Sequence, residues 1–382
     1  MRILLIFIGI LVSSCDPFVT QFTDTEDAVP YTASSLTSTI ETPAELKVMT
    51  WNIRFGVGRL PWFGDSCGDN VIVQEKTVMD TLIKIAAFIN DENPDILLLQ
   101  EVDVSSKRTG YIDQVQWLLE HTNFNYGAYA SMWKADFIPS DGLGKVDAGN
   151  AILSKWPIEN PERIQLPLRG DQDGLTQYFY LRRNILKSKI NINDQKEIYA
   201  LCTHTTAFAT DDTKKKHIDK FYDVLASIDS TEIFVAGGDL NALTSAYVNN
   251  RDFCTVDKCD NDVCDGDYES NLIYQGSYFN HLENEEFLLN ELYTFHPAIP
   301  LENTNFPENY THSTWIIGED YVDTNNDDLH QSVDSEIILD NGPLNRKLDY
   351  IFSSEQLENG ITHQSEFYLS DHVPVSVTLV LP

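Results

Sequence analysis

The chain has 382 residues, enough for one large α/β domain or two ordinary ones, and its apolar content of 42% is sufficient for a hydrophobic core. Asp and Glu number 59 against 26 Lys and Arg, which gives a formal net charge of −33. Such a surface repels polyanions on average. The composition therefore weighs against a protein that grips duplex DNA, although it leaves room for a local cationic cleft.

The first fifteen residues, MRILLIFIGILVSSC, predict an export signal. They combine one arginine, an apolar stretch too short to span a bilayer and small residues before Cys15. The ending LVSSC resembles a bacterial lipobox, which implies a signal peptide over residues 1–14, acylation of Cys15 and attachment to a membrane of the cell envelope. An ordinary signal peptide is the alternative. Residues 15–45 are rich in Thr, Ser and acids, so we expect a flexible tether. No later apolar run is long enough to cross a membrane.

Hydrophobic periodicity then predicts a strand-helix-strand pattern at two places in the chain. The predicted elements are strands over residues 46–53, 96–101, 197–204 and 232–241, and helices over residues 74–90 and 211–228. Residues 251–345 interrupt this alternation with acidic, Asn-rich and aromatic sequence, so we expect a long excursion from the rim of the sheet. Within it, DKCDNDVCDGD invites a calcium interpretation, but no register fits an EF-hand, and a solvated acidic loop is the alternative.

The cysteines suit an exported protein, in which disulfides can form. With Cys15 acylated, an odd number remains, so at least one thiol should be free. Cys202 lies in a predicted strand and should be buried. We predict that Cys67 is bonded to one of three cysteines in the excursion, because both segments should leave the sheets at the same rim. The three are Cys254, Cys259 and Cys264.

Polar side chains stand at the ends of several predicted strands. They are Asn52, Glu101, His204, Asp239, Asn241, Asp349, Asp371 and His372. Each of these residues alone can be explained without a function, as a capping residue or an ordinary loop residue. Together, four buried carboxylates would cost several kcal/mol per uncompensated charge, and a divalent cation removes that cost. Oxygen donors without a cysteine cluster suit Mg²⁺ or Mn²⁺, with Ca²⁺ possible, better than zinc.

The segments that carry these residues resemble the endonuclease/exonuclease/phosphatase superfamily. The matching motifs, in the family's order, are TWNIR, LLLQEVD, GNAILSKWPI, THTTAF, GGDLNA, RKLDYIF and LSDHVPV. The resemblance covers residues 46–382, with the acidic insertion at about 251–345, and is nearest to bacterial sphingomyelinase-type phosphodiesterases. It implies an α/β fold, a four-layer α/β/β/α sandwich with two mixed sheets packed face to face, and a metal-dependent phosphoester hydrolase site at one end.

The resemblance and the chemistry of the side chains together suggest roles. Glu101, Asn52 and Asp371 would hold the metal. Asp349 would orient His372, which would take a proton from the attacking water. The remaining candidates would position the water or bind the phosphate: Asp239, Asn241, His204 and Asn150. His204 would also support the leaving oxygen. Arg182 or Arg183 could clamp a phosphate with two hydrogen bonds, but their segment fits an outward strand face equally well, so both are left out of the site.

Three functions fit this sequence. The first is a membrane-tethered, metal-dependent phosphodiesterase or phosphatase that acts on a phospholipid head group or a small phosphoester. The second is an extracellular nuclease, which the net charge disfavours. The third is a surface lipoprotein that binds a ligand on the same scaffold without catalysis. Because none of the metal or base residues is missing, we expect an enzyme.

Overall fold

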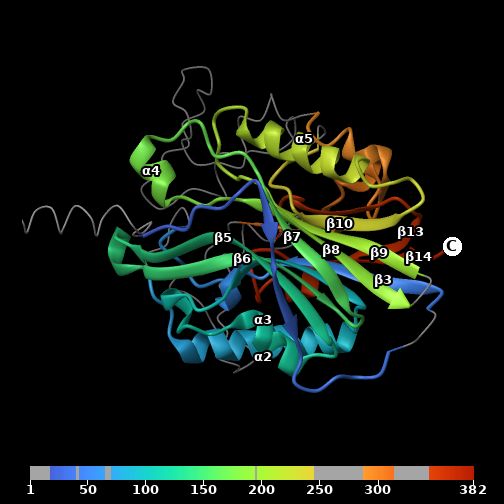
Figure 1. Cartoon of the computed structure of the whole chain (residues 1–382), viewed down its shortest axis with the longest axis horizontal. Helices are drawn as coiled ribbons and strands as arrows, with labels where there is room; N and C mark the ends of the chain where they lie inside the picture. Colours follow the sequence, from blue (N-terminus) through green and yellow to red (C-terminus); the bar gives the residue numbers. More distant parts are fainter. Residues whose placement is uncertain (1–17, 40–42, 65–69, 194–195, 245–286, 314–343) are drawn as a thin grey trace, which may run out of the picture.

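The computed structural model of the chain describes residues 18–39, 43–64, 70–193, 196–244, 287–313 and 344–382. Within these ranges, two seven-stranded sheets pack face to face and helices cover their outer faces (Figure 1). The predicted α/β sandwich with two mixed sheets is therefore confirmed. The signal peptide, Cys15, the predicted partners of the disulfide and the acidic DKCDNDVCDGD segment all lie outside the described residues.

The first sheet has the strand order β13-β14-β3-β4-β6-β5-β2. Its strands are β13 (Leu357–Thr362), β14 (Val375–Val380), β3 (Glu45–Asn52), β4 (Ile96–Asp103), β6 (Gly144–Ser154), β5 (Tyr126–Ile138) and β2 (Val29–Thr32). Only β3 and β4 run parallel, and helix α2 (Glu75–Glu92) connects them, as the sequence pattern predicted.

The second sheet has the strand order β1-β7-β8-β9-β10-β12-β11. Its strands are β1 (Thr25–Asp27), β7 (Ile158–Gln165), β8 (Asn184–Asn193), β9 (Lys196–His204), β10 (Ile233–Asp239), β12 (Asp349–Ser353) and β11 (His296–Pro297). The parallel pair is β9 and β10, joined by helix α5 (Thr213–Ala226). Each sheet thus contains one parallel pair with a helical crossover, and the ends of these pairs carry the predicted site.

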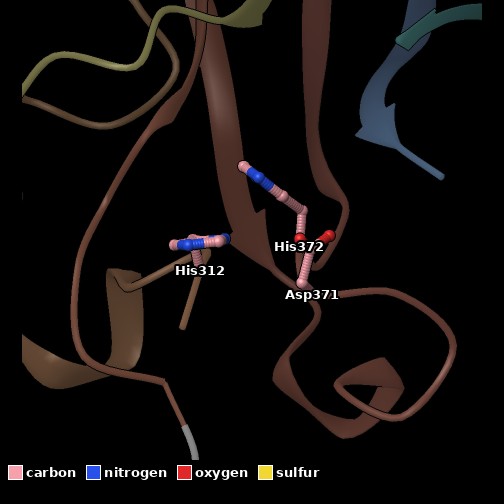
Figure 2. A group of neighbouring side chains, drawn as sticks. All are labelled: His312, Asp371 and His372. Atoms are coloured by element: carbon pink, nitrogen blue, oxygen red, sulfur yellow. The ribbon is translucent and has the colours of Figure 1, made fainter. Parts of the chain in front are cut away.

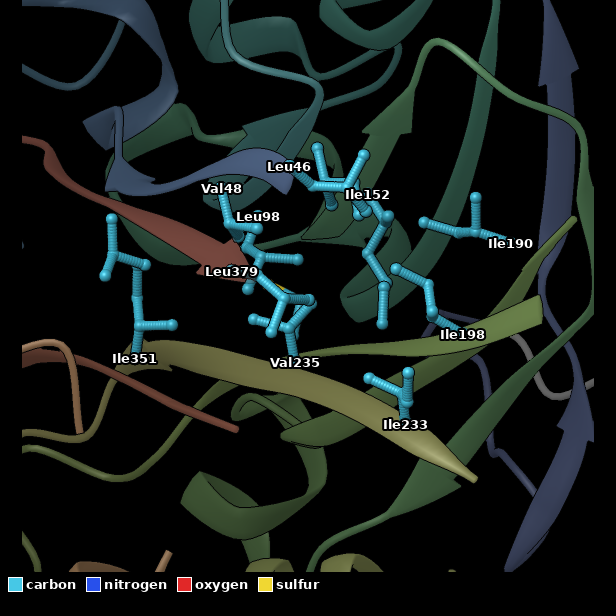
Figure 3. Packing of buried hydrophobic residues seen from close by; sticks show 14 of the residues in the cluster. Leu46, Val48, Leu98, Ile152, Ile190, Ile198, Ile233, Val235, Ile351 and Leu379 are labelled. Carbon is cyan, nitrogen blue, oxygen red and sulfur yellow. The ribbon is translucent and has the colours of Figure 1, made fainter. Parts of the chain in front are cut away.

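The central core lies between the sheets and is built from aliphatic side chains of both (Figure 3). Leu46, Val48 and Leu98 project from the first sheet, and Ile198 and Val235 project from the second. All five are essentially inaccessible to solvent. Truncating one of them to alanine would typically cost about 2–5 kcal/mol of stability, because the rigid sheets can collapse only partly around the cavity.

Two further apolar layers attach the helices. On the first sheet, α2 and α3 (Gln114–His121) bury Ile85, Ile89 and Leu118 against the outer face. On the second sheet, α5 buries Ile218 and Phe221 in the same manner. The apolar stripes predicted from the sequence are therefore the faces that pack on the sheets. A short helix, α4 (Gly174–Phe179), lies in the connection between β7 and β8.

The prediction of a flexible tether over residues 15–45 is wrong for its middle part. Strand β1 pairs with β7 at the edge of the second sheet, and β2 pairs with β5 at the edge of the first. The segment buries Val19 and Ala28. Its sequence shows no clear apolar period, so the two strands were not predicted. Both strands are short and lie at sheet edges, where pairing depends on backbone hydrogen bonds more than on an alternating apolar pattern.

Part of the predicted excursion is also ordered. Residues 287–313 contain short turns, bury Leu289 and Leu292 beside α5, and place β11 at the edge of the second sheet. Cys202 is a buried free thiol, as predicted. Among the residues that the structure describes, no helix has the length and hydropathy needed to span a membrane.

Candidate active site

The strands bring most of the predicted polar residues to one end of the sandwich. Parallel strands β3 and β4 end at Asn52 and near Glu101, and parallel strands β9 and β10 end at His204 and Asp239. Strand β12 runs antiparallel to β10 and begins with Asp349, which pairs with Asp239. Strand β14 runs antiparallel to β3 and follows directly after Asp371 and His372. The sheet topology alone therefore gathers these side chains.

Asn52 links the two sheets across the site. Its side-chain amide donates one hydrogen bond to Glu101 Oε1 at 3.1 Å and another to Asp239 Oδ2 at 3.1 Å. Its carbonyl oxygen Oδ1 accepts from the backbone N–H of Arg54 at 3.0 Å. Asn52 is fully buried and its orientation is fixed on both sides. It therefore holds one carboxylate from each sheet at a defined separation.

Left-handed backbone conformations accompany these residues. Glu101 has φ 55° at a register shift in the pairing of β4 with β6, and Asn241 has φ 46°. Arg54 and Phe55, just after Asn52, have φ 44° and 43°. Such conformations cost non-glycine residues about 1–3 kcal/mol each, and they persist where surrounding contacts enforce them. Here the bulge turns the Glu101 side chain toward the site.

Asp239 is the most heavily contacted carboxylate of the site. His204 Nε2 lies 3.2 Å from Asp239 Oδ2, and His372 Nε2 lies 3.5 Å from the same oxygen. The backbone N–H of Asn241 donates to Oδ1 at 2.9 Å. Asp239 is 1% exposed. Its two oxygens therefore receive donors from both sheets and from the loop that follows β10.

Close backbone packing explains the glycine before Asp239. Gly238 has φ 141°, and a Cβ atom there would lie 1.9 Å from the carbonyl oxygen of Thr203 on the neighbouring strand. Only glycine tolerates both conditions. The GGDLN stretch is therefore shaped to place Asp239 and Asn241 beside His204, and Lys214 of α5 fixes the loop by donating to the Asn241 carbonyl at 2.6 Å.

His372 is held by Asp349. The distance from His372 Nδ1 to Asp349 Oδ2 is 2.8 Å, and both side chains are buried. Asp371 points to the other side, where its Oδ2 lies 3.5 Å from Arg54 Nε. Ser370 ties this turn to β3 because its hydroxyl donates to the Asn52 carbonyl at 2.8 Å.

Burial and neighbouring charges shift the pKa values in opposite directions. Burial raises the pKa of Asp239 to about 7, against the opposing effect of His372. Burial alone would lower the pKa of His372, but Asp349 and Asp239 outweigh it and raise the pKa to about 10. The pKa of His204 falls well below its usual value because of burial and nearby Arg183. At neutral pH the site thus pairs an imidazolium with a carboxylate that titrates near 7.

The donor atoms suit a divalent cation. Burial and the charge of Asp371 raise the pKa of Glu101, which shows that these two carboxylates repel each other. One ligand atom each of Asp239, Asp349 and His372 lie within 4.8 Å of one another, and so do atoms of His312, Asp371 and His372. Asp349 Oδ1 is buried without a hydrogen-bond partner among the described residues. Carboxylate and amide oxygens predominate, so the residues fit Mg²⁺ or Mn²⁺ better than zinc.

One predicted site residue, Asn150, makes its hydrogen bonds outside the group of candidates. Asn150 lies on β6 and its amide donates to the backbone and side-chain oxygens of Asn184 at 3.2 Å. No hydrogen bond within the described residues joins it to the other candidates, although its Oδ1 is buried without a partner. Asn150 therefore links β6 of the first sheet to the start of β8 in the second, next to Arg183.

Sequence reasoning missed two residues at the site. Arg183 is buried, and its guanidinium donates to the His204 carbonyl at 3.3 Å. Arg183 precedes a strand in which polar and apolar residues are mixed, so the sequence does not indicate which face of the sheet its side chain occupies. His312 packs against His372 with ring centroids 4.3 Å apart. The residues around His312 have no strand or helix period, and its segment reaches the site by pairing with the regions before β12 and β14.

The two-sheet sandwich thus carries buried carboxylates and an Asp–His pair together at one end, the arrangement expected of a phosphoester hydrolase. The chain belongs to the endonuclease/exonuclease/phosphatase family, whose model matches residues 49–372. This family membership was predicted from the motifs and is confirmed. No curated protein matches the chain.

Solved structures of the same family resemble this fold. An endonuclease/exonuclease/phosphatase from Beutenbergia cavernae DSM 12333 is 20% identical with a TM-score of 0.51, over 89% of this chain and 72% of that one. A family protein from Leptotrichia buccalis C-1013-b is 16% identical with a TM-score of 0.49, over 88% and 100% of the two chains. The human nocturnin catalytic domain with bound sulfate anion is 15% identical with a TM-score of 0.47, over 88% and 93%. At these identities the likeness concerns the fold.

Proposed function

We propose that the protein is a divalent-metal-dependent phosphoester hydrolase that acts on a phospholipid head group or a small phosphoester. One observation carries the proposal: Asp349, His372 and Asp239 form a continuous buried chain of contacts, at 2.8 Å and 3.5 Å, beside Glu101 and Asn52. Within one site, Asp239 can accept a proton, His372 carries a positive charge and Glu101 can bind a metal.

A metal bound by Glu101, Asp371 and Asn52 would polarise the phosphoryl oxygens and offset the charge that develops in the transition state. This chain's own residues supply the rest. The sequence-based prediction gave proton acceptance to His372. Because the pKa of His372 is raised to about 10, its imidazole is already protonated at neutral pH. We therefore assign proton acceptance from water to Asp239, whose pKa of about 7 suits that task.

His372 then acts as a positive donor. Its imidazolium, held through Nδ1 by Asp349, can donate from Nε2 to a phosphoryl oxygen. His204 is kept neutral, and its Nε2 faces Asp239. A neutral imidazole has a single N–H. His204 directs this N–H to Asp239, so none remains for a hydrogen bond to the leaving oxygen. Asn241 follows Asp239 in a fixed loop and is the second candidate for positioning the water.

The charges around the site favour a small anionic substrate. Buried guanidinium groups of Arg54 and Arg59 lie at Asp371, and that of Arg183 interacts with Asp239, so a phosphate group would meet these cations as well as the bound metal. Three lysines in the lysine-rich segments KSK and TKKKH are paired with acidic residues: Lys215 with Asp219, Lys216 with Asp212, and Lys189 with Glu197. A polymer of phosphates would meet a largely acidic surface, which disfavours the nuclease alternative.

A substrate screen tests this proposal. Purified protein with Mg²⁺ is assayed on sphingomyelin, phosphatidylinositol, small phosphate mono- and diesters and DNA, with His372→Ala as the control for contaminating activity. We expect a phospholipid or small ester to have the highest kcat/KM, and any DNA cleavage to improve from about 10 to 150 mM salt as repulsion is screened. DNA hydrolysis faster than all other substrates and weakened by salt would favour a nuclease. Phosphate binding without turnover of any substrate would favour a non-catalytic binding protein.

We also propose that the protein is an exported lipoprotein attached to the cell envelope through Cys15. The support is the sequence of residues 1–15 alone. Mass spectrometry of the mature N-terminus should find an acylated Cys15, and Cys15→Ser should release the protein into the soluble fraction. An unmodified N-terminus elsewhere would contradict the proposal.

A further inference from the structure

Residues 311–313 form a short strap between the segments that lead into β12 and β14. The backbone N–H of His312 donates to the Arg346 carbonyl at 2.9 Å, and the backbone N–H of Val373 donates to the Thr311 carbonyl at 2.8 Å. The Thr311 hydroxyl also accepts from the backbone N–H of Asp349 at 3.2 Å. The strap is thus fixed by the same segments that carry the Asp349–His372 pair, so His312 has a defined place beside them.

The His312 side chain faces the catalytic histidine. Figure 2 shows its imidazole beside that of His372, with Asp371 at the base of the same turn. The two ring centroids are 4.3 Å apart and the planes are tilted by 44°. His312 is 7% exposed, and its Nδ1 is buried with no hydrogen-bond partner in the described part of the chain. Buried polar atoms are almost always paired in folded proteins, so an unpaired one beside a catalytic residue points to a missing ligand.

The surroundings indicate what kind of ligand this is. His372, Arg346 and Arg59 bring positive charge to the surroundings of His312, and the Asp371 carboxylate brings negative charge. An imidazole has at least one N–H to donate in either protonation state. Because these positive groups outnumber the one carboxylate beside them, an anionic oxygen is attracted to the N–H of His312.

The three side chains are close enough together to contact one oxygen atom. One ligand atom each of His312, Asp371 and His372 lie within 4.8 Å of one another. An oxygen seated between the two imidazoles can be about 2.7–3.2 Å from a nitrogen of each, the normal range for a hydrogen bond. We propose that His312 is a further substrate-binding residue, which donates a hydrogen bond from its imidazole to an oxygen of the phosphoester group beside His372. This inference deepens the proposed function and rests on it.

The test measures binding as well as turnover. Inorganic phosphate is titrated calorimetrically into the Mg²⁺-loaded wild-type protein and into His312→Phe, His312→Gln and His296→Phe. Phenylalanine keeps an aromatic ring against His372 but has no nitrogen, whereas glutamine keeps an N–H donor. His296→Phe makes the same substitution at an exposed histidine on β11. The same variants are assayed on whichever phosphoester the wild type hydrolyses.

We expect His312→Phe to lose about tenfold or more in phosphate affinity and in kcat/KM, the usual effect of losing one hydrogen bond to a charged group. His312→Gln should retain most of both, and His296→Phe should match wild type. Equal phosphate affinity in wild type and a folded His312→Phe protein would overturn the inference. Failure of the wild type to hydrolyse any phosphoester would count against the proposed function, while the calorimetric comparison would still decide whether His312 binds phosphate.

Discussion

His372 Nδ1 and Asp349 Oδ2 lie 2.8 Å apart in the buried end of the sandwich, and Asp349 pairs in register with Asp239 on the adjacent strand. This contact links the two sheets at the site. β12 of the second sheet supplies the carboxylate, and the turn before β14 of the first sheet supplies the imidazole. The carboxylate both fixes the ring and stabilises its positive charge, as in other Asp–His pairs.

Asp349→Asn should lower the turnover number at least about a hundredfold, because an amide cannot stabilise the imidazolium of His372. The pKa of His372 should fall from its raised value, and an NMR titration of the ring measures this directly. Asp147→Asn is a suitable control, since Asp147 is another buried carboxylate, bonded to Tyr129 and Ser131. Near-normal turnover in a folded Asp349→Asn protein would show that the pair is only structural.

The pH dependence of kcat/KM should be bell-shaped. Asp239 must be ionised to accept a proton, and its pKa is raised to about 7, so activity should rise with pH up to that value. A bound cation stabilises the carboxylate and moves this limb lower. His372 must stay protonated, so activity should fall as pH approaches about 10. A profile that falls steadily between pH 6 and 8 would contradict both assignments.

Removing divalent metal should abolish hydrolysis. Glu101 and Asp371 raise each other's energy when both are ionised, and a cation relieves this repulsion. Dialysis against EDTA is expected to leave the fold intact by circular dichroism, and Mg²⁺ or Mn²⁺ should restore activity. Full activity in metal-free protein would contradict the metal-binding role of these carboxylates.

The parts of the site that the sequence predicted are those attached to regular strands. Apolar runs identified β3, β4, β9 and β10, and polar residues at their ends were therefore placed at one edge. Residues that depend on tertiary pairing were not predicted. His312 lies on a strap without periodicity, and β1 and β2 are short edge strands whose pairing is held by backbone hydrogen bonds. Long-range backbone pairing leaves little trace in local sequence.

Gly238→Ala should damage the site through the backbone. The new Cβ would lie 1.9 Å from the Thr203 carbonyl, and φ 141° is unfavourable for alanine. We expect a loss of about 3 kcal/mol or more in unfolding free energy, together with displacement of Asp239. Gly174→Ala is the matched control, because its Cβ meets nothing within 4 Å. Equal melting temperatures for the two variants would refute the packing argument.

Arg183 should contribute to phosphate binding. Its guanidinium is buried beside His204, and its Nε has no hydrogen-bond partner within the described residues. Burial lowers its pKa, but a guanidinium stays charged at neutral pH, so the group keeps its charge and a free donor at the site. A planar guanidinium can give two parallel N–H donors to a phosphate, whereas an ammonium cannot. Arg183→Lys should therefore raise KM, or lower kcat/KM, by about tenfold despite conserving charge.

The neighbouring arginine separates this effect from a general loss of stability. Arg182 donates to the carbonyls of Tyr178 and Tyr180 and to Gln21, in the direction of α4 and the N-terminal segment. Arg182→Lys should lower the melting temperature without changing kcat/KM. Because both variants make the same chemical change one residue apart, a larger kinetic effect at position 183 isolates the contact with substrate. If Arg182→Lys proved as damaging to kcat/KM as Arg183→Lys, with similar stability losses, Arg183 would be a structural residue of the β8 end.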